Sequence, residues 1–383
     1  MNREGLQNAV AVAALTPPGR GAVATVAVWG SGATDTVAAL FSPASGRTLA
    51  DARIGQIVFG RWAGHSGEEL VVCRRADEEI EIHCHGGQAA VAAIVASMVE
   101  RGCRTLSWAD WVRRQTADRF TVEAVEALAK VTTLRCAAVL VDQHSGVLRN
   151  ELEDCLGLLE AAGDESQVAA ARRLEAMAKR GNVGRHLIEP FRVVIAGKPN
   201  VGKSSLINAL AGYQRSIVFD QPGTTRDVVS VRTAIDGWPV ELSDTAGLRA
   251  TTDCLEAAGV ELSLGRMQAA DQVLLVFDAS QRWTQADDEL AAQWPAALVV
   301  YNKADLAAPD RSRPGLYTSA TTGTGVEALL RKLAVLLVPV PPPPGAAVPF
   351  LPRHDETLQA VLRALAENDG PGAAKLLRTA LKM

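Results

Sequence analysis

The sequence of 383 residues is poor in aromatic residues and has no large excess of either charge. Aromatic residues make up 4% of the chain, charged residues make up 21%, and the formal net charge is -4. Without a global positive charge, any binding of nucleic acid must come from a local basic patch. No apolar run reaches the roughly 20 residues that a membrane-spanning helix needs. The apolar content of 48% is still enough for a large core, and the length predicts two or three domains.

Cysteines are few and widely spaced. None of the six belongs to a Cys-x-x-Cys pair, and the N-terminus does not resemble a signal peptide, so neither a disulfide framework nor secretion is expected. We therefore expect reduced thiols in a cytoplasmic protein that does not associate with a membrane. The six are Cys73, Cys84, Cys103, Cys136, Cys155 and Cys254.

The first part of the chain predicts a compact α+β domain over residues 1–116. Its apolar runs AVATVAVWG and EEIEIHCHGG are typical of strands, and AAVAAIVASMVERG, between Ala89 and Gly102, is typical of a helix. Residues 117–190 have few glycines and carry apolar residues at helical spacing, such as Leu152, Leu156 and Leu159. We expect a helical region there.

Residues 191–338 alternate the strand-like runs FRVVIAG, QVLLVFD and ALVVYN with helical segments, which predicts a parallel sheet built from βαβ units. Residues 339–352 are rich in proline and predict a stiff, extended spacer. Residues 353–383 predict two short helices broken at residues 369–372, the Asp-Gly-Pro-Gly run.

A phosphate-binding loop is predicted at Gly197-x-x-x-x-Gly202-Lys203-Ser204, because an apolar strand precedes it and the helical run SSLINALAG follows. The glycines let backbone amides curl around phosphates, the lysine reaches the outer phosphates, and the first serine ligates Mg²⁺. The expected nucleotide-binding residues of this loop are Asn200, Val201, Gly202, Lys203, Ser204 and Ser205.

A second part of the same site is predicted at Asp244-Thr245-Ala246-Gly247, which follows the strand-like run PVELS. The aspartate would hold the water shell of the magnesium ion, and the amide of Gly247 would meet the γ-phosphate.

The run VVYNKAD predicts the base-binding part of the site. It places Asn302, Lys303 and Asp305 at a strand end, where ligands bind in open α/β sheets. The carboxylate of Asp305 can accept from both N1–H and the exocyclic amine of guanine, a pair that adenine does not offer. A backbone amide of Ser319-Ala320 would lie near guanine O6. The expected nucleotide is therefore GTP.

Two groups used by Ras-like enzymes are missing from the pattern. Leu248 follows the glycine where those enzymes have the glutamine that orients the attacking water, and no arginine finger can be identified. Another group must position the water, and another cation must stabilise the charge on the phosphates. Asn200 and the segment FDQPGTTRD, residues 219–227, are the candidates.

These residues resemble the MnmE (TrmE) family of tRNA-modification GTPases. The resemblance rests on GKPNVGKSSLINALAG, on GTTRD, on DTAGLR with the ExxG that follows at residues 256–259, on TPPGRG at residues 16–21, and on the order of the regions. It implies a folate-binding-like α+β N-terminal domain followed by a helical domain, into which an α/β P-loop GTPase domain is inserted.

The resemblance also implies the ions and the catalytic group. Potassium takes the place of an arginine finger, with Asn200 as one ligand. Its other ligands are the backbone carbonyls of Phe219 and Gln221 and the region of Thr224, while Thr225 joins Ser204 on Mg²⁺. Glu256 matches the glutamate that orients the water; without the resemblance, it would be read as a solvated glutamate on a helix.

The remaining implications concern the N-terminal domain and the partners. In the family this domain dimerises and binds 5-formyltetrahydrofolate, which supplies a one-carbon unit for the wobble uridine of tRNA, together with the flavoprotein MnmG. Of the pocket positions, Glu81 is retained, Arg119 replaces a lysine, and Ala27 replaces an arginine expected on the first strand. The chain stops at Met383 without the family's Cys-x-Gly-Lys tail, so we expect a divergent, C-terminally shortened member.

A metal site is a less favoured reading of His83, Cys84 and His85. The two histidines would share one face of a strand while the cysteine points to the other, and no further ligand lies nearby in sequence. The favoured reading is that His85-Gly86-Gly87 turns the strand into the following helix.

Three functions stay open on the sequence. The first is a potassium-dependent GTPase that takes part in wobble-uridine (U34) modification of tRNA. The second is a divergent regulatory or assembly switch that keeps GTP hydrolysis and has lost the modifying chemistry. The third is a nucleotide-binding protein without turnover.

Overall fold

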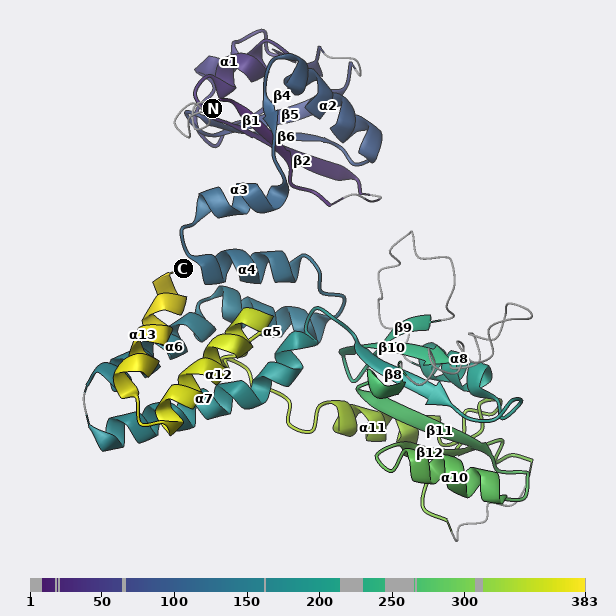
Figure 1. Ribbon diagram of the computed structural model, residues 1–383. Coiled ribbons are helices and arrows are strands. Elements are labelled where there is room, and N and C mark those ends of the chain that lie inside the picture. The colour runs from purple at the N-terminus through teal and green to yellow at the C-terminus, as the bar shows by residue number, and fades with distance from the viewer. Residues whose placement is uncertain are drawn as a thin grey trace, which may run out of the picture. The chain divides into compact units, whose positions relative to one another are not determined.

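The computed structural model describes residues 9–17, 19, 21–63, 67–161, 163–213, 230–244, 265, 267–306 and 313–382. The chain divides into two compact units, Met1–Val122 and Glu123–Met383 (Figure 1). Each unit is built around its own sheet or helices, and each is described in turn.

The first unit contains, in its described residues, a seven-stranded sheet with the order β3-β4-β5-β6-β2-β1-β7. Neighbouring strands are antiparallel except for β1 and β7, which are parallel. The strands are β1 (Ala11–Ala14), β2 (Val23–Trp29), β3 (Phe41–Pro43), β4 (Ile57–Trp62), β5 (Glu69–Ala76), β6 (Glu79–His85) and β7 (Arg104–Thr105).

Side chains of β2 and β6 point alternately to the two faces of the sheet, and those on one face are fully buried. Val26 and Val28 of β2 and Ile80 and Ile82 of β6 pack into one core with Ile94 of the helix α2. The other face of β2 carries smaller or aromatic side chains that pack against α3. The α+β class predicted for this region is confirmed. The helical elements are α1 (Ala33–Ala38), the 3₁₀ turn η1 (Leu49–Asp51), α2 (Gln88–Glu100) and α3 (Trp108–Gln115).

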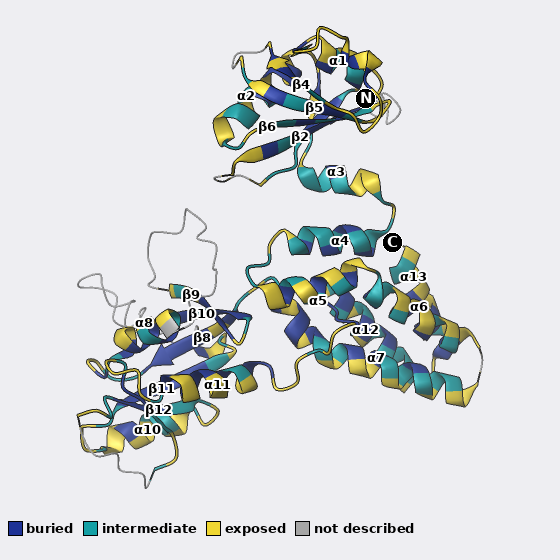
Figure 2. Ribbon diagram, turned by 180° about the vertical axis from the view of Figure 1, so that it is seen from behind, coloured by how far each residue is buried: buried dark blue, intermediate teal, exposed yellow. Residues whose placement is uncertain are grey.

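The second unit contains a sheet with the order β13-β12-β11-β8-β10-β9. Its pairings are parallel except for the hairpin of β9 and β10, so the predicted parallel sheet of βαβ units is confirmed. Figure 2 shows β8, β11 and β10 mostly buried, as expected for strands covered on both faces. The elements are β8 (Phe191–Ala196), α8 (Lys203–Tyr213), β9 (Ser230–Ile235), β10 (Trp238–Asp244), β11 (Gln272–Asp278), α10 (Gln285–Gln293), β12 (Leu298–Asn302), β13 (Leu316–Tyr317) and α11 (Val326–Leu337).

The predicted helical region is also present, and it combines segments from before and after the sheet (Figure 1). The helix α12 packs against α7 and α13, and α13 packs against α6. The helices are α4 (Arg119–Leu128), α5 (Leu134–His144), α6 (Val147–Glu160), α7 (Asp164–Arg185), α12 (Pro352–Ala366) and α13 (Gly370–Lys382). Within the described part of the chain, none of the helices is both long and apolar enough to span a membrane.

The break between the last two helices lies earlier than predicted. The helix α13 begins at Gly370, so it includes Pro371 and Gly372, which were expected to lie in the break. Proline is tolerated here because the first turn of a helix has no intrahelical partner for its amides. The carboxylate of Asp369 accepts from the amide of Gly372 (2.8 Å) and so caps the helix start.

The proline-rich segment is packed in its second half, which the pattern of a spacer did not indicate. Val348 is completely buried, and its amide donates to the side chain of Gln143 on α5. On α7, a Cβ added to Gly184 would lie 1.7 Å from the carbonyl oxygen of Pro349. The segment therefore follows a fixed route along the helices before α12 begins.

Two contacts connect the helices with the sheet of the second unit. Arg135 of α5 donates to Asp236 in the β9–β10 turn (2.6 Å) and lies over the ring of Trp238. His186, just after α7, stacks on Phe191 with ring centroids 3.8 Å apart. The chain therefore enters β8 through a packed junction.

Candidate functional site

The candidate nucleotide-binding residues that the structure describes lie at or after the ends of β8, β10, β12 and β13, and Asp278 at the end of β11 lies beside them. The loop of residues 197–202 follows β8, while Asp244, Asp278 and Asn302 are the last residues of β10, β11 and β12. The register pairs Asp278 with Asn302 directly. Because parallel strands end at the same edge of a sheet, these residues gather in one place.

The phosphate loop requires glycine at its two signature positions. Gly197 and Gly202 have φ angles of +151° and +91°. A Cβ on Gly197 would lie 2.2 Å from the carbonyl oxygen of Val276, and one on Gly202 would lie 2.4 Å from the side-chain nitrogen of Asn302. Neither position has room for a side chain, so the loop can form only with these glycines.

Asn200, the predicted potassium ligand, also has a backbone role. Its φ angle is +65°, in the left-handed region where asparagine is several-fold enriched among residues other than glycine. Its side chain is exposed at the loop surface. An asparagine is therefore favoured at this position by conformation alone, and an experiment on ion binding has to separate the two roles.

The structure brings Lys203, Ser204 and Asp244 together. The ammonium of Lys203 donates to the carbonyl oxygen of Lys198 (3.1 Å) and lies 3.9 Å from a carboxylate oxygen of Asp244. The hydroxyl of Ser204 donates to the other oxygen of Asp244 (3.1 Å). The lysine is the first residue of α8, where the helix dipole and free amides favour an anion. A hydroxyl and a carboxylate are oxygen ligands suited to Mg²⁺.

Asn302 ties three loops together. It is 1% exposed, and its side-chain nitrogen donates to the carbonyl oxygen of Val201 (3.0 Å) in the phosphate loop. Its side-chain oxygen accepts from the amide of Ala320 (3.1 Å) and from the hydroxyl of Thr318 (3.4 Å). The amide of Ser319 donates to the carbonyl oxygen of Thr324. The contact of a 319–320 amide with guanine O6 stays a prediction.

Lys303 and Asp305 continue the same loop. Lys303 has a φ angle of +62°, and its ammonium lies 2.7 Å from a carboxylate oxygen of Asp278. Asp305 is exposed on the following turn and is available to a base. Burial would raise the pKa of Asp278, but hydrogen bonds from Lys303 and Ser280 outweigh it and hold that pKa below its usual value.

Sequence reasoning missed Asp278, although a usable signal was present. Asp278 ends the run QVLLVFD, just as Asp244 and Asn302 end their own strands. A polar residue at the carboxyl end of a buried parallel strand marks the ligand-binding edge of the sheet. The rule that selects Asn302 from the end of its strand therefore also selects Asp278.

The remaining predicted residues of the nucleotide site lie outside the described residues. They are Thr245, Ala246 and Gly247 of the second motif, the water-positioning Glu256, and the predicted ion ligands Phe219, Gln221, Thr224 and Thr225.

In the first unit, the predicted folate residues occupy β6 and the start of α4. The carboxylate of Glu81 lies 3.6 Å from Arg75 and 3.4 Å from the ring of His83. Ala27 is paired with Glu81 and is completely buried, but it lies on β2 and not on the first strand as expected. Arg119 is the first residue of α4.

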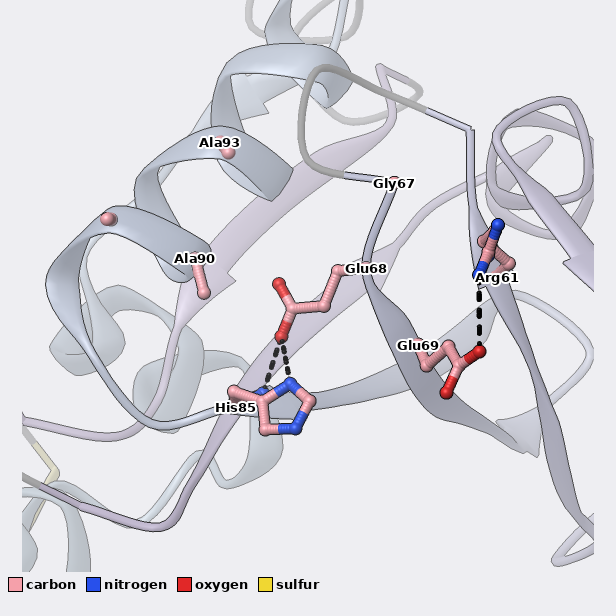
Figure 3. A pocket seen from close by; sticks show the side chains of 8 residues that line it. Arg61, Gly67, Glu68, Glu69, His85, Ala90 and Ala93 are labelled. Atoms are coloured by element: carbon pink, nitrogen blue, oxygen red, sulfur yellow. Dashed lines mark hydrogen bonds and ion pairs between the residues drawn. The ribbon is translucent and has the colours of Figure 1, made fainter.

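A groove of about 630 Å³ lies between α2 and the ends of β4, β5 and β6 (Figure 3). Three alanines of α2 line one side, and on the other side Glu68 accepts from the amide and the ring of His85 (2.7 and 2.8 Å) while Arg61 pairs with Glu69. Its charged side chains thus pair with one another. In the described ranges, no cluster of three His, Cys, Asp or Glu residues is arranged to hold a metal ion.

Two family models match the chain. Residues 10–115 match "GTP-binding protein TrmE N-terminus", and residues 192–303 match "50S ribosome-binding GTPase". The first match covers the sheet of the first unit, and the second covers the nucleotide edge of the second sheet up to Lys303.

Similar proteins match over most of the chain. The tRNA modification GTPase MnmE of Synechococcus sp. (strain WH7803) is 33% identical, and the match covers 88% of this chain and 83% of that protein. The protein of the same name from Heliobacterium modesticaldum is also 33% identical, over 77% of this chain and 72% of its own length. Among solved structures, Era of Aquifex aeolicus matches 40% of this chain and 57% of its own, with 28% identity and a TM-score of 0.31.

Proposed function

This chain belongs to the MnmE family of tRNA modification GTPases and is a GTP hydrolase, and from this we propose two further properties. Potassium assists its hydrolysis of GTP, and this reaction serves wobble-uridine (U34) modification of tRNA. The contacts of Lys203 and Ser204 with Asp244, beside the phosphate loop that Asn302 holds, support hydrolysis of GTP. Membership of the family supports the roles of potassium and of tRNA.

The described residues fit GTP and magnesium in distinct roles. Lys203 and the amides that begin α8 bind the outer phosphates, and Asp305 reads the guanine edge. Ser204 and Asp244 offer the oxygen atoms for magnesium, which when bound neutralises charge on the phosphates. Water attacks the γ-phosphorus, the bond from this phosphorus to the bridging oxygen breaks, and GDP and phosphate leave.

We assign the orientation of the attacking water to Glu256. Family membership supports this role, as does the presence of Leu248 at the position where Ras-like enzymes carry a glutamine. Glu256→Ala is expected to lower kcat by two orders of magnitude or more while the affinity for GTP stays within about threefold. A variant that hydrolyses GTP at the normal rate would remove this assignment.

Potassium is proposed as the cation that replaces an arginine finger, held by Asn200, the backbone of Phe219 and Gln221, and Thr224. The test uses the left-handed backbone of Asn200. Asn200→Gly keeps this conformation and removes the side-chain oxygen, whereas Asn200→Asp keeps an oxygen at the same position. We expect the glycine variant to lose the rate difference between potassium and sodium buffers, and the aspartate variant to retain a part of it. If Asn200→Gly retains the full potassium response, Asn200 is not a ligand.

The domain arrangement is part of the proposal. We assign residues 1–116 to the N-terminal domain, 117–190 and 353–383 to the helical domain, 191–338 to the inserted GTPase domain and 339–352 to its linker. The packing of α12 on α7 and of α13 on α6 supports the return of the chain to the helical domain.

The proposed partners are tRNA, an MnmG-like flavoprotein and a second copy of the chain through the N-terminal domain, with 5-formyltetrahydrofolate as the one-carbon source. The named relatives are tRNA modification GTPases. Their names do not favour the alternative of a regulatory or assembly switch that has lost the tRNA-modifying chemistry. The test is expression in a strain that lacks the family enzyme, followed by mass spectrometry of the wobble nucleosides. Restoration of the modified uridine is expected, and expression of folded protein without it would refute the proposed role.

A further inference from the structure

We propose that residues 278–287 position both the phosphate loop and the base loop of the nucleotide site. This stretch runs from the last residue of β11 into the first turn of α10 and is here called the β11–α10 connection. The connection does this through two aspartates, one for each loop. Asp287 holds Lys198 of the phosphate loop, and Asp278 holds Lys303 of the base loop. The inference rests on the proposed function, because it concerns how the GTP site is kept in shape.

The first tie joins Lys198 to the start of α10. Its ammonium lies 2.7 Å from one carboxylate oxygen of Asp287 and donates to the hydroxyl of Thr284 (2.9 Å). The other oxygen of Asp287 accepts from the amide of Thr284 (2.9 Å), which is part of the capping box of α10, and it also accepts from the hydroxyl of Thr284 (2.7 Å). Asp287 is 6% exposed. The lysine is therefore fixed to a carboxylate that the helix start itself holds in place.

This tie reaches the phosphate-binding lysine in one further step. The carbonyl oxygen of Lys198 accepts from the ammonium of Lys203 (3.1 Å), and Lys203 is 6% exposed. Anchoring the side chain of Lys198 restricts the position of its backbone and hence of this carbonyl. Asp287 consequently acts on the phosphate site through Lys198, without being part of the phosphate loop.

The second tie joins Lys303 to the end of β11. The carboxylate of Asp278 accepts from Lys303 (2.7 Å) and, through its other oxygen, from the amide and hydroxyl of Ser280 (2.9 and 2.6 Å). The side chain of Asp278 is 3% exposed. Lys303 precedes the guanine-reading Asp305 by two residues and has a left-handed backbone. The tie stabilises a backbone conformation that lysine adopts reluctantly.

In each pair only the aspartate is buried, since the side chains of the two lysines are 42% and 30% exposed. The buried carboxylate distinguishes these pairs from ordinary surface ion pairs, which contribute little because water screens them. Each aspartate here is almost fully shielded, and removing its lysine leaves a buried carboxylate with one partner fewer. Both pairs also come from one short stretch of chain. The β11–α10 connection therefore holds both the loop that binds phosphate and the loop that binds the base.

The experiment measures the release of a fluorescent GDP analogue by stopped flow, together with KM and kcat, in the full-length protein. The variants are Lys198→Met, Asp287→Asn and their combination, with Lys198→Arg as the conservative replacement. Glu289→Gln is the matched control, because Glu289 is exposed on the same helix and bonds with Gln285.

We expect release to become five- to twentyfold faster and KM to rise by a similar factor in both single variants, with kcat within about twofold. The double variant should be no worse than the worse single variant, and Lys198→Arg should recover most of the loss. Asp278→Asn should show the same split between KM and kcat. If Asp287→Asn does not fold, Lys198→Met tests the same tie and leaves the capping box intact.

An unchanged rate of release of the GDP analogue in a folded Lys198→Met protein would overturn the proposal. So would a double variant whose increase in release rate equals the product of the increases in the two single variants. Failure of the unmodified protein to bind the GDP analogue would instead refute the proposed GTP site. The two failures are therefore distinguishable.

Discussion

The side-chain nitrogen of Asn302 donates a 3.0 Å hydrogen bond to the carbonyl oxygen of Val201, a residue 101 positions earlier in the chain. The bond joins the loop that follows β12 to the phosphate loop that follows β8. Because Asn302 is buried, its two polar atoms depend on their protein partners rather than on water. The residue therefore stabilises the site as a whole.

Replacing Asn302 by alanine should weaken nucleotide binding strongly. The change leaves the carbonyl of Val201 and the amide of Ala320 without their buried partner, at a cost of about 1–3 kcal/mol for each group. We expect the Kd of GDP, measured by fluorescence titration, to rise at least about tenfold. Thr322→Ala, in the exposed part of the neighbouring turn, serves as the control. An unaltered Kd in a folded Asn302→Ala protein would contradict this role.

Replacing Asp305 by asparagine should change the preferred base. The carboxylate can accept from two guanine donors, whereas an amide presents one donor and one acceptor. We expect the affinity for GTP to fall at least about a hundredfold, because one amide hydrogen then faces a guanine hydrogen. Xanthosine triphosphate, which carries an oxygen in place of the guanine amine, should bind the variant better than GTP does. Competition binding with the two nucleotides measures the change, and equal GTP affinity in both proteins would refute the role of Asp305.

Alanine at Gly184 should destabilise the second unit. An added Cβ would lie 1.7 Å from the carbonyl oxygen of Pro349, so α7 and the proline-rich segment would have to separate. We expect the free energy of unfolding to fall by about 2–4 kcal/mol in urea denaturation.

Gly157→Ala is the matched control for Gly184→Ala. Gly157 lies on α6, and a Cβ there would meet no atom within 4 Å. Alanine should stabilise this helix by up to about 1 kcal/mol. Opposite signs for the two variants are expected, and a loss of stability in both would show that the contact with Pro349 is not the cause.

Acid should weaken the pairing of α4 with α12. Burial would raise the pKa of Glu123, but hydrogen bonds from His354 and Arg353 outweigh it and lower that pKa to about 2. Because the pKa is lowered in the folded state, the stabilisation is complete above the ordinary value of about 4.5 and is lost as the pH falls from there towards 2. The total loss is about 3 kcal/mol.

Urea denaturation at several pH values between 7 and 3 tests this pH dependence. Glu123→Gln should be less stable at pH 7 and should show a shallower loss of stability below pH 4.5. A variant with the same pH profile as the unmodified protein would contradict the role of Glu123 in acid sensitivity.

Local patterns were sufficient for much of the fold. The alternation of apolar and polar residues in EIEIHCHGG predicts β6, and the apolar runs of residues 191–338 predict a parallel sheet. Both predictions hold because a strand has to bury its apolar side chains whichever strands lie beside it. The motif glycines were predictable for a similar reason. At Gly197 and Gly202 the loop leaves no space for a Cβ, and this constraint belongs to the motif itself.

Features that depend on distant partners could not be read from the sequence. Val348 is buried where its amide binds Gln143, more than 200 residues earlier, and the side chain of Asn302 is held by the carbonyl of Val201 in another loop. The start of α13 is a different case, because its signal is local: the Asp-Gly-Pro-Gly run is typical of a break, but its aspartate is also a residue type that caps helix starts. The cap that Asp369 provides favours a helix start instead.

The contact of Gly184 with Pro349 fixes where the chain leaves the helices and where it comes back. Between these two residues lie all the described strands of the second sheet, yet the two ends of that stretch touch. Closing a short gap costs little chain entropy. A short linker could therefore replace the stretch between these two residues, and we expect the main loss on the side of the helices to be the contact of Val348 with Gln143.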